Sequence, residues 1–276
     1  MAAGFIHPSA QIDPGAVLGE GVRVGPFAVI GANVTIGAGT EIGAGAQVYG
    51  PARIGSGNRI HPQACIGFEP QDLKYQGEEV WLEIGDNNQF RELCTIHRGT
   101  AKGGGVTRIG SDNLFMAYTH VAHDCQVGSR VVFANNATLA GHVEVHDDAT
   151  ISAFTSVHQF CRVGRHAYVG GYSVVTMDAL PFAKTVGLKP AFYGLNSIGL
   201  KRKGVDPGSI RRLEQAMRLL VRSGLNTAQA LERVRAELGG DPEVDYLVSF
   251  IEGAKRGVHK SRPRGGRSGG SESEAE

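Results

Sequence analysis

The segment AYTHVAHDCQVG, residues 117–128, holds the side chains with the clearest catalytic potential: His120, His123 and Asp124. Neutral imidazoles bind zinc, and a histidine beside a carboxylate can act as a general base whose tautomer the carboxylate fixes. A single histidine at a turn is usually solvated and without function. These residues alone therefore do not distinguish a metal ligand from a base or from a polar surface, and the choice depends on what the fold brings to them.

Aliphatic or aromatic residues recur every six positions through most of the first 180 residues. One series runs from Ile6 to Ile66, and a later one runs from Ile109 to Val175. This period fits neither a 3.6-residue helix nor two-residue strand alternation. It is typical of short strands joined by tight turns, with three hexads to a coil, stacked as a parallel β-helix. Many hexads place glycine after the aliphatic residue, and we expect these glycines and the asparagines of the repeat to let the backbone turn with positive φ.

Two interruptions and a change of period divide the chain. Residues 68–83 are polar and residues 101–108 are glycine-rich, and we expect both to be loops on the binding face of a β-helix that spans residues 1–190. Helical spacing predicts a small all-α domain over residues 191–258 that covers the open end of the β-helix. Residues 201–267 carry 15 Lys and Arg against 8 Asp and Glu, which favours an acidic partner. The tail, 259–276, lacks the apolar content to fold, and we predict that it is disordered.

The composition argues against several classes of protein. The whole chain has 28 Lys and Arg against 27 Asp and Glu, so no overall charge attracts nucleic acid or an anionic membrane. No apolar run reaches the length of a membrane span, and the N-terminus lacks the charged start and apolar core of a secretory signal. The four cysteines are scattered without a C-x-x-C pair, as expected for reduced thiols. We predict a cytoplasmic protein that neither binds nucleic acid nor inserts stably into a membrane.

The length of the coil predicts which distant residues are neighbours. Positions one coil apart stack at roughly the ~4.8 Å spacing of adjacent strands. Steps of eighteen residues from His123 predict one patch on three coils, made of His123, Gly141, His142, His158 and Gln159. Three imidazoles together favour a functional site, either a three-ligand zinc site or a general base oriented by Asp124. No G-x-S-x-G elbow in the repeats supplies a covalent nucleophile, so direct transfer to an acceptor hydroxyl suits the residues better.

Several motifs, in their order and spacing, resemble one known family. They are QDLKY (71–75), TIHRGT (95–100), GSDNLFM (110–116), HVAHDCQVG (120–128), NNATLAGHV (135–143) and VHQF (157–160). Over about residues 5–258 the chain resembles the UDP-N-acetylglucosamine 3-O-acyltransferases, which take the first step of lipid A synthesis. The resemblance implies a homotrimer of left-handed β-helices with active sites between neighbouring subunits. It also implies transfer of a 3-hydroxyacyl group from the phosphopantetheine of acyl carrier protein to the sugar 3-hydroxyl, without a metal or other cofactor.

The resemblance also implies roles for individual residues. His123 is expected to be the general base, Asp124 its orienting carboxylate, and the backbone N–H of Gly141 the donor to the oxyanion. Contacts to the sugar, the phosphates, the acyl group or the carrier are expected from Gln71, Asp72, Lys74, His120, His142, His158, Gln159, Asn196, Arg202 and Lys203. Gly171 matches a position that limits acyl length, and a glycine there predicts room for a longer chain.

Two positions depart from the family pattern. Ile198 stands where the family often has a carboxylate, and Lys203 stands where it often has a second arginine. Lysine cannot form the bidentate fork that arginine makes to a phosphate. The nucleotide contacts are therefore expected to be weaker or differently arranged, and an amino-sugar variant of the acceptor stays open.

Two other functions compete with the acyltransferase. A trimeric β-helix zinc enzyme of the carbonic anhydrase type explains the histidines, but it gives no role to the QDLKY loop or to the helices. A non-catalytic β-helical scaffold does not explain why polar residues gather on three coils. The acyltransferase accounts for the histidines, both loops, the basic helices and the lack of a nucleophile, and we therefore predict that activity.

Overall fold

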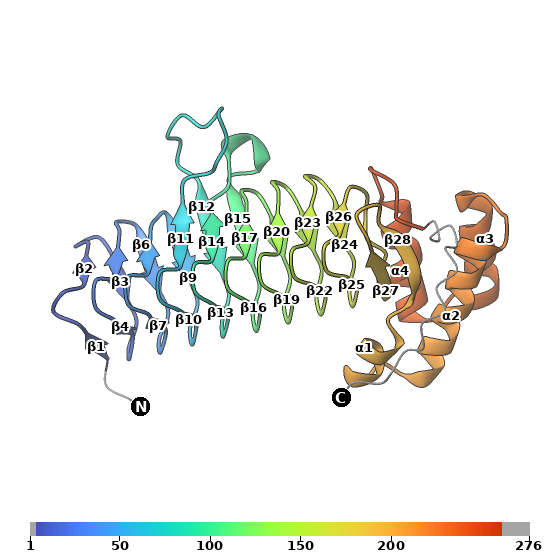
Figure 1. Ribbon diagram of the computed structural model, residues 1–276, viewed down its shortest axis with the longest axis horizontal. Helices are drawn as coiled ribbons and strands as arrows, with labels where there is room; N and C mark the ends of the chain where they lie inside the picture. Colours follow the sequence, from blue (N-terminus) through green and yellow to red (C-terminus); the bar gives the residue numbers. More distant parts are fainter. Residues whose placement is uncertain (1–3, 261–276) are drawn as a thin grey trace.

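The hexad repeat folds as a left-handed parallel β-helix, a long three-sided prism with four helices at its C-terminal end (Figure 1). This computed structural model describes residues 4–260. Each coil contributes one short strand to each of three sheets, which we call faces A, B and C. The predicted fold class, an all-β left-handed β-helix with a small all-α domain, is confirmed.

The strands of each face follow one another along the prism axis. Face A consists of β1 (Phe5–Ile6), β4 (Arg23–Val24), β7 (Glu41–Ile42), β10 (Arg59–Ile60), β13 (Gln89–Phe90), β16 (Leu114–Phe115), β19 (Val132–Phe133), β22 (Thr150–Ile151), β25 (Tyr168–Val169), β27 (Ala183–Val186) and β28 (Ala191–Leu195). Face B consists of β2 (Gln11–Ile12), β5 (Val29–Ile30), β8 (Gln47–Val48), β11 (Cys65–Phe68), β14 (Thr95–His97), β17 (His120–Val121), β20 (Thr138–Leu139), β23 (Ser156–Val157) and β26 (Val174–Val175). Face C consists of β3 (Val17–Leu18), β6 (Val34–Ile36), β9 (Ala52–Ile54), β12 (Trp81–Ile84), β15 (Val106–Ile109), β18 (Gln126–Val127), β21 (Glu144–Val145) and β24 (Arg162–Val163).

The strand register confirms the eighteen-residue coil. His120 pairs with Thr138, and Gln126 pairs with Glu144. The two insertions lengthen two coils, so Thr95 pairs with Cys65 on one side and with His120 on the other. Residues eighteen apart in sequence are therefore strand partners only in coils that contain no inserted loop.

The interior of the prism is filled by the residue that ends each strand and by a smaller residue four positions later. Phe90, Phe115 and Phe133 stack along the axis with ring centroids 4.9 and 4.7 Å apart. The small positions hold buried alanines and the buried thiols of Cys94, Cys125 and Cys161. Every coil buries apolar surface against the next, so the fold is stabilised by stacking rather than by one central core.

Of the glycines that follow the aliphatic residue, Gly67 has the expected positive φ (79°), but for the others the expected reason was wrong. Gly37 has no positive φ; a Cβ there would lie only 2.5 Å from the backbone carbon of Gly55 on the next coil. Positive φ falls two residues after the glycine, where Asn33 (φ 57°) and Phe27 (φ 58°) show that other residues adopt it. The glycines are needed because adjacent coils approach closely at the turns, whereas the expectation for asparagine holds at Asn136 (φ 60°).

Both loops leave the prism at one edge, which we call edge BC because it joins face B to face C (Figure 1). The first connects β11 to β12, and the second connects β14 to β15 and contains the short 3₁₀ helix η1 (Ala101–Gly103). The predicted domain and loop boundaries stay predictions. His259 is buried and accepts a hydrogen bond from the N–H of Met177 at 3.1 Å, and the rest of the predicted tail from residue 261 lies outside the described residues.

Four helices follow the last strands: α1 (Ser197–Arg202), α2 (Pro207–Arg222), α3 (Thr227–Leu238) and α4 (Pro242–Glu252). The side chains of Asp206, Asn226 and Asp241 accept hydrogen bonds from the first turns of α2, α3 and α4. The apolar sides of the four helices share one core with the β27–β28 hairpin, so the helices cover the end of the β-helix. None of these helices combines the length and the apolar character needed to cross a bilayer.

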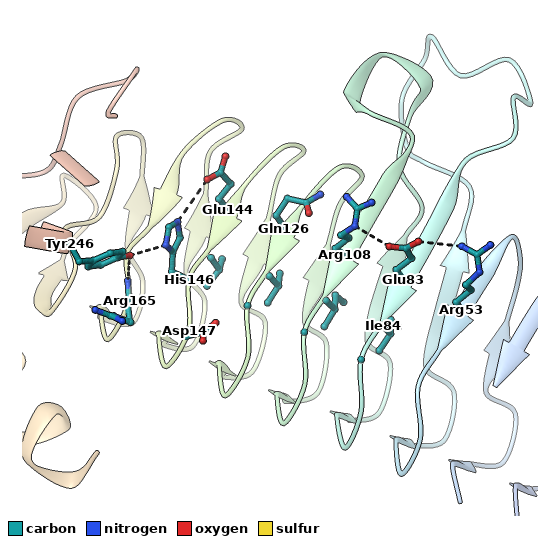
Figure 2. A pocket seen from close by; sticks show the side chains of 16 residues that line it. Arg53, Glu83, Ile84, Arg108, Gln126, Glu144, His146, Asp147, Arg165 and Tyr246 are labelled. Atoms are coloured by element: carbon teal, nitrogen blue, oxygen red, sulfur yellow. Dashed lines mark hydrogen bonds and ion pairs between the residues drawn. The ribbon is translucent and has the colours of Figure 1, made fainter. Parts of the chain in front are cut away.

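Helix α4 is fastened to face C by a polar network. The N–H of Arg165 donates to the Tyr246 hydroxyl at 3.0 Å, and this hydroxyl also forms a hydrogen bond with His146 Nδ1 at 2.8 Å (Figure 2). Tyr246 thereby closes one end of a groove that runs along face C past Glu144 and Arg108 (Figure 2).

Candidate active site

The histidine patch lies at edge BC, where the chain turns after β17, β20 and β23. Asp124 and His142 occupy the turn positions of consecutive coils with φ of 61° and 60°. In an extended strand, adjacent side chains point to opposite faces. The positive φ of Asp124 instead brings its carboxylate beside the imidazole of its neighbour His123.

His123 and Asp124 form a hydrogen-bonded pair, with 2.7 Å between Nδ1 and Oδ2. The Asp124 side chain is 0% exposed. Burial acts to raise the pKa of its carboxyl, but hydrogen bonds from His123 and Thr100 outweigh burial and hold that pKa below its ordinary value. Because an ionised carboxylate only accepts, Nδ1 of His123 carries a proton, and in the neutral imidazole Nε2 then has the free lone pair. This is the tautomer that a general base needs.

Gly141 lies directly beside the ring of His123, one coil further along. A Cβ at this glycine would lie 2.5 Å from the ring carbon Cε1 of His123, so only glycine lets the imidazole approach this backbone. The N–H of the next residue, His142, is already used, because it donates to the carbonyl of His123 at 3.0 Å. Within residues 4–260 the N–H of Gly141 has no acceptor, so it is free to bind a ligand.

His142 completes the cluster. Its ring meets the ring of His123 edge to face, with centroids 5.2 Å apart, and its Nε2 lies 3.6 Å from Asp124 Oδ2. It also stacks on Phe160 at 4.5 Å, and burial lowers its pKa. At neutral pH His142 is therefore a neutral donor or acceptor rather than a cation.

His120 extends the row of imidazoles along the same edge. Its Nδ1 lies 2.7 Å from the Thr95 hydroxyl, and its ring lies 5.3 Å from that of His97. Burial, with repulsion from His97 and His123, lowers the pKa of His120 to about 4. The ring is therefore neutral under ordinary conditions.

Sequence reasoning missed two residues of this site, His97 and Thr100. The ring of His97 is buried against the first loop, with Nδ1 2.5 Å from the carbonyl oxygen of Glu69. Thr100 bonds the Asp124 carboxylate directly. Both belong to the TIHRGT motif, but the second insertion shifts the register, so an eighteen-residue step from His123 does not reach them.

The other predicted site residues are distributed over two edges and both loops. Asp72 and Lys74 line a pocket between the loops together with Thr100 and Lys102, and the charge of Asp72 acts on His142. Gln71 is exposed on the first loop. His158 and Gln159 lie at edge BC one coil beyond His142, exposed, and their only contact with each other is His158 Nδ1 to the Gln159 carbonyl at 3.1 Å.

The three C-terminal residues lie elsewhere in the chain. Asn196 caps α1 and donates from Nδ2 to the carbonyl of His166, and Lys203 pairs with Asp148 at 2.9 Å. His166 and Asp148 are turn residues of the edge between faces C and A, which we call edge CA. Arg202 is exposed at the end of α1. Within one chain, therefore, this group is not brought to the histidine cluster at edge BC.

The two remaining positions are Ile198 and Gly171, and both are exposed. The side chain of Ile198 is 67% exposed on α1. Gly171 follows β25 at the turn from face A to face B, and a Cβ there would lie 3.2 Å from the carbonyl oxygen of Ala153.

His123, Asp124 and His142 are also the set whose donor atoms lie close enough for a metal ion, all within 4.8 Å of one another. The Asp124 carboxylate is already used in another way, because both of its oxygens accept hydrogen bonds from Thr100 or His123. A zinc ligand must direct a free lone pair at the ion. His123 Nε2 and His142 could do so, but without Asp124 only two of the three ligands remain. The arrangement therefore fits a hydrogen-bonded dyad better than a zinc site.

The fold and this site together define a hexapeptide-repeat transferase. The family model described as bacterial transferase hexapeptide (six repeats) matches residues 33–67 and 107–141. A second model, described as UDP N-acetylglucosamine O-acyltransferase, domain 2, matches residues 178–259. The chain belongs to the UDP-N-acetylglucosamine O-acyltransferase family, as the motifs predicted, and it is an acyltransferase.

Relatives and solved structures support this assignment over almost the whole chain. A protein of Alkalilimnicola ehrlichii is 52% identical over 92% of this chain and 98% of its own, and one of Thiobacillus denitrificans is 51% identical over the same shares. Both are named acyl-[acyl-carrier-protein]–UDP-N-acetylglucosamine O-acyltransferase. The structure of a UDP-N-acetylglucosamine acyltransferase from Bacteroides fragilis matches 92% of this chain and 99% of its own with 44% identity and a TM-score of 0.90. That of the O-acyltransferase from Moraxella catarrhalis matches the same shares with 41% identity and a TM-score of 0.89.

Proposed function

We propose that the protein transfers a 3-hydroxyacyl group from acyl carrier protein to the 3-hydroxyl of UDP-N-acetylglucosamine, the first step of lipid A synthesis. The names of the relatives supply the donor and the acceptor. The observation that carries the chemistry is the 2.7 Å hydrogen bond between His123 and the buried Asp124. It leaves one imidazole nitrogen unprotonated at an open edge of the prism.

The reaction is a direct transfer. Nε2 of His123 takes the proton of the sugar hydroxyl while the sugar oxygen attacks the thioester carbonyl carbon. The N–H of Gly141 donates to the oxyanion of the tetrahedral intermediate, and such a donor is typically worth ~3–4 kcal/mol. Collapse breaks the carbon–sulfur bond, and the departing phosphopantetheine thiolate recovers the proton from His123. Asp124 stays ionised and stabilises the imidazolium that forms between the two steps.

Substrate contacts are proposed from both edges. Gln71, Asp72 and Lys74 on the first loop, with His120, His142, His158 and Gln159, are the contacts proposed at edge BC. Asn196, Arg202 and Lys203 at edge CA are proposed for the nucleotide and the carrier, and the basic helices would attract an acidic carrier protein. Ile198 and Lys203 leave the nucleotide without a carboxylate partner and without a second guanidinium fork.

This division supports the proposed homotrimer. One chain places the two groups at different edges, so a site that uses both must combine edge BC of one subunit with edge CA of a neighbour. Face C lies between these two edges, and in such a ring it turns toward the threefold axis. The absence of a side chain at Gly171 is proposed to admit a longer acyl chain.

The experiment is an assay of the purified full-length protein with a panel of 3-hydroxyacyl carrier proteins and with both UDP-N-acetylglucosamine and its amino-sugar variant. We expect His123→Ala to lose roughly 10²–10⁴-fold in kcat because the base is gone. His7→Ala, which removes an imidazole far from edge BC near the N-terminus, is the matched control and should keep wild-type kcat. Wild-type turnover in folded His123→Ala would refute the proposed base.

The same assay decides the zinc alternative. We expect full acyl transfer after dialysis against a chelator, because the proposed route needs no metal. Loss of activity that returns with Zn²⁺ alone would favour the zinc enzyme.

A further inference from the structure

Both ends of the second insertion form hydrogen bonds with Asp124, one end with its carboxylate and the other with its backbone N–H. Thr100 precedes η1, and Thr107 lies on β15, the strand to which the chain returns. The N–H and the hydroxyl of Thr100 both donate to Asp124, while Thr107 Oγ1 accepts from the Asp124 backbone N–H at 2.8 Å. Both threonines are buried. Residues at both ends of the insertion are therefore hydrogen-bonded to Asp124, the residue that orients His123.

The two bonds from Thr100 reach different oxygens of the carboxylate. Its N–H lies 2.8 Å from Oδ1, and its hydroxyl lies 2.6 Å from Oδ2, the oxygen that His123 also uses. Two anchors on two oxygens fix the plane of a carboxylate, whereas a single anchor lets it rotate. The bond to His123 is thus held in direction as well as in length.

The Thr100 hydroxyl is itself fixed. Its oxygen accepts from the N–H of Gly103 at 3.2 Å, so its proton is directed to Asp124. The Thr100 carbonyl accepts from the N–H groups of Gly103 and Gly105 at 3.0 and 2.8 Å. The base of the insertion is tied to β12, because Trp81 donates to the carbonyl of Gly105 at 2.7 Å. This loop is a rigid short turn around Thr100.

Gly103 lies against the same carboxylate from outside. A Cβ at this position would overlap the Asp124 carboxyl group, although Gly103 has no positive φ that would demand glycine. The glycine at position 103 is therefore explained by its close approach to Asp124.

We propose that residues 100–107 form a clasp that fixes the Asp124 carboxylate on His123, with Thr100 as a positioning residue for the acyl transfer. This proposal rests on the proposed function. A buried carboxylate that loses one of its donors gains a second orientation and becomes a poorer partner for the imidazolium. Thr100 contacts no reacting atom, so its removal should slow the chemical step and leave substrate binding intact.

The test compares isosteric and conservative variants of the purified full-length protein. Thr100→Val keeps the shape and the N–H but removes the hydroxyl, and we expect kcat to fall by roughly 10- to 100-fold with KM for the UDP-sugar within about twofold. Thr100→Ser retains the hydroxyl and should recover most of kcat. Thr40→Val is the matched control, since Thr40 is a buried threonine in the N-terminal coils whose hydroxyl donates to the carbonyl of Gly55 at 3.0 Å. It should leave kcat unchanged.

A double-mutant cycle separates positioning from general loss of structure. If Thr100 acts through Asp124, Thr100→Val should cost little further kcat once Asp124→Asn is present. Equal losses in both backgrounds, or wild-type kcat in folded Thr100→Val, would overturn the clasp. Should Thr100→Val fail to fold, Gly103→Ala disturbs the same carboxylate without removing any donor, and wild-type kcat in that variant would count against the proposal.

The two proposals fail separately. If His123→Ala is inactive while folded Thr100→Val has wild-type kcat, only the clasp is lost. If His123→Ala keeps wild-type turnover, the proposed function itself is lost, whatever the Thr100 variants show.

Discussion

The pairing of His123 with Asp124 depends on one backbone angle. The two residues are neighbours in sequence, and in a strand their side chains would point apart. The φ of 61° at Asp124 turns the carboxylate back to its neighbour, at a cost of ~1–2 kcal/mol for a residue other than glycine. The hydrogen bonds that Asp124 receives from His123 and Thr100 offset this cost.

A pH-dependent stability follows from His120. The pKa of this imidazole is about 4 in the folded chain, against an ordinary value of 6.5, chiefly because of burial and then because of His97 and His123. The unfolded chain therefore binds more protons between these values, and the free energy of unfolding falls as the pH drops from 6.5 to 4. For His120 alone the full effect is about 3 kcal/mol.

The measurement is thermal or denaturant unfolding at pH 7 and at pH 5. The wild type should lose stability on acidification, and His120→Gln should lose less because it carries no proton. Burial is also the chief cause of lowered pKa values at His97, His142, His166 and His259. On acidification these four residues lower the free energy of unfolding of the wild type and of the variant alike. An identical loss in wild type and variant would contradict the assigned role of His120.

At the scale of elements, the coil of this β-helix is set by two different demands at each turn. Gly37 is needed for space, since a Cβ would meet Gly55 and Ser56 backbone atoms at 2.5 and 2.6 Å. Gly39, two residues later, has a φ of 67° and open space around it. Position 37 leaves no room for a side chain, whereas position 39 tolerates any residue that accepts a left-handed conformation.

Two substitutions separate these demands. We expect Gly37→Ala to lower the free energy of unfolding by about 1–3 kcal/mol, because backbone atoms of the next coil cannot yield. Gly39→Asn should change it by less than about 1 kcal/mol, because asparagine enters the left-handed region readily. Denaturant unfolding at one protein concentration checks both. A larger loss for Gly39→Asn than for Gly37→Ala would show that conformation, not space, governs the turn.

At the scale of the whole molecule, face C is the surface that the proposed homotrimer would bury. Its charges are paired along the face, with Glu83 joined to Arg53 and Arg108 at 3.3 and 3.0 Å (Figure 2). The Arg53 guanidinium also lies 4.0 Å over the ring of Trp81. Paired side chains of this kind can be covered without leaving isolated charges buried.

The predicted homotrimer gives a direct test of this face. Light scattering or sedimentation should give the wild type three times the mass of one chain. Arg108→Glu places a second carboxylate beside Glu83 on the proposed interface and should shift the protein toward monomers with loss of activity. Arg91→Glu, at the edge between faces A and B and paired only with its neighbour Glu92 at 3.1 Å, should remain trimeric. A monomeric wild type would rule out a site shared between subunits, and a fully active trimer of Arg108→Glu would place the interface elsewhere.

The sequence by itself determined the β-helix and the central part of the site. A six-residue period fixes the length of a coil, and that length fixes which residues stack, so Gly141 and His142 could be placed beside His123 from their numbers alone. Local periodicity suffices because each coil contacts only the next one.

Only the tertiary structure decided the rest. The two insertions make their coils longer than eighteen residues. Sequence spacing alone therefore did not place His97 and Thr100 beside His123. The φ of Asp124 decided that its carboxylate meets His123, and helix packing at the end of the prism decided that Asn196 and Lys203 lie at a different edge. These placements depend on contacts between segments far apart in sequence, which no local repeat encodes.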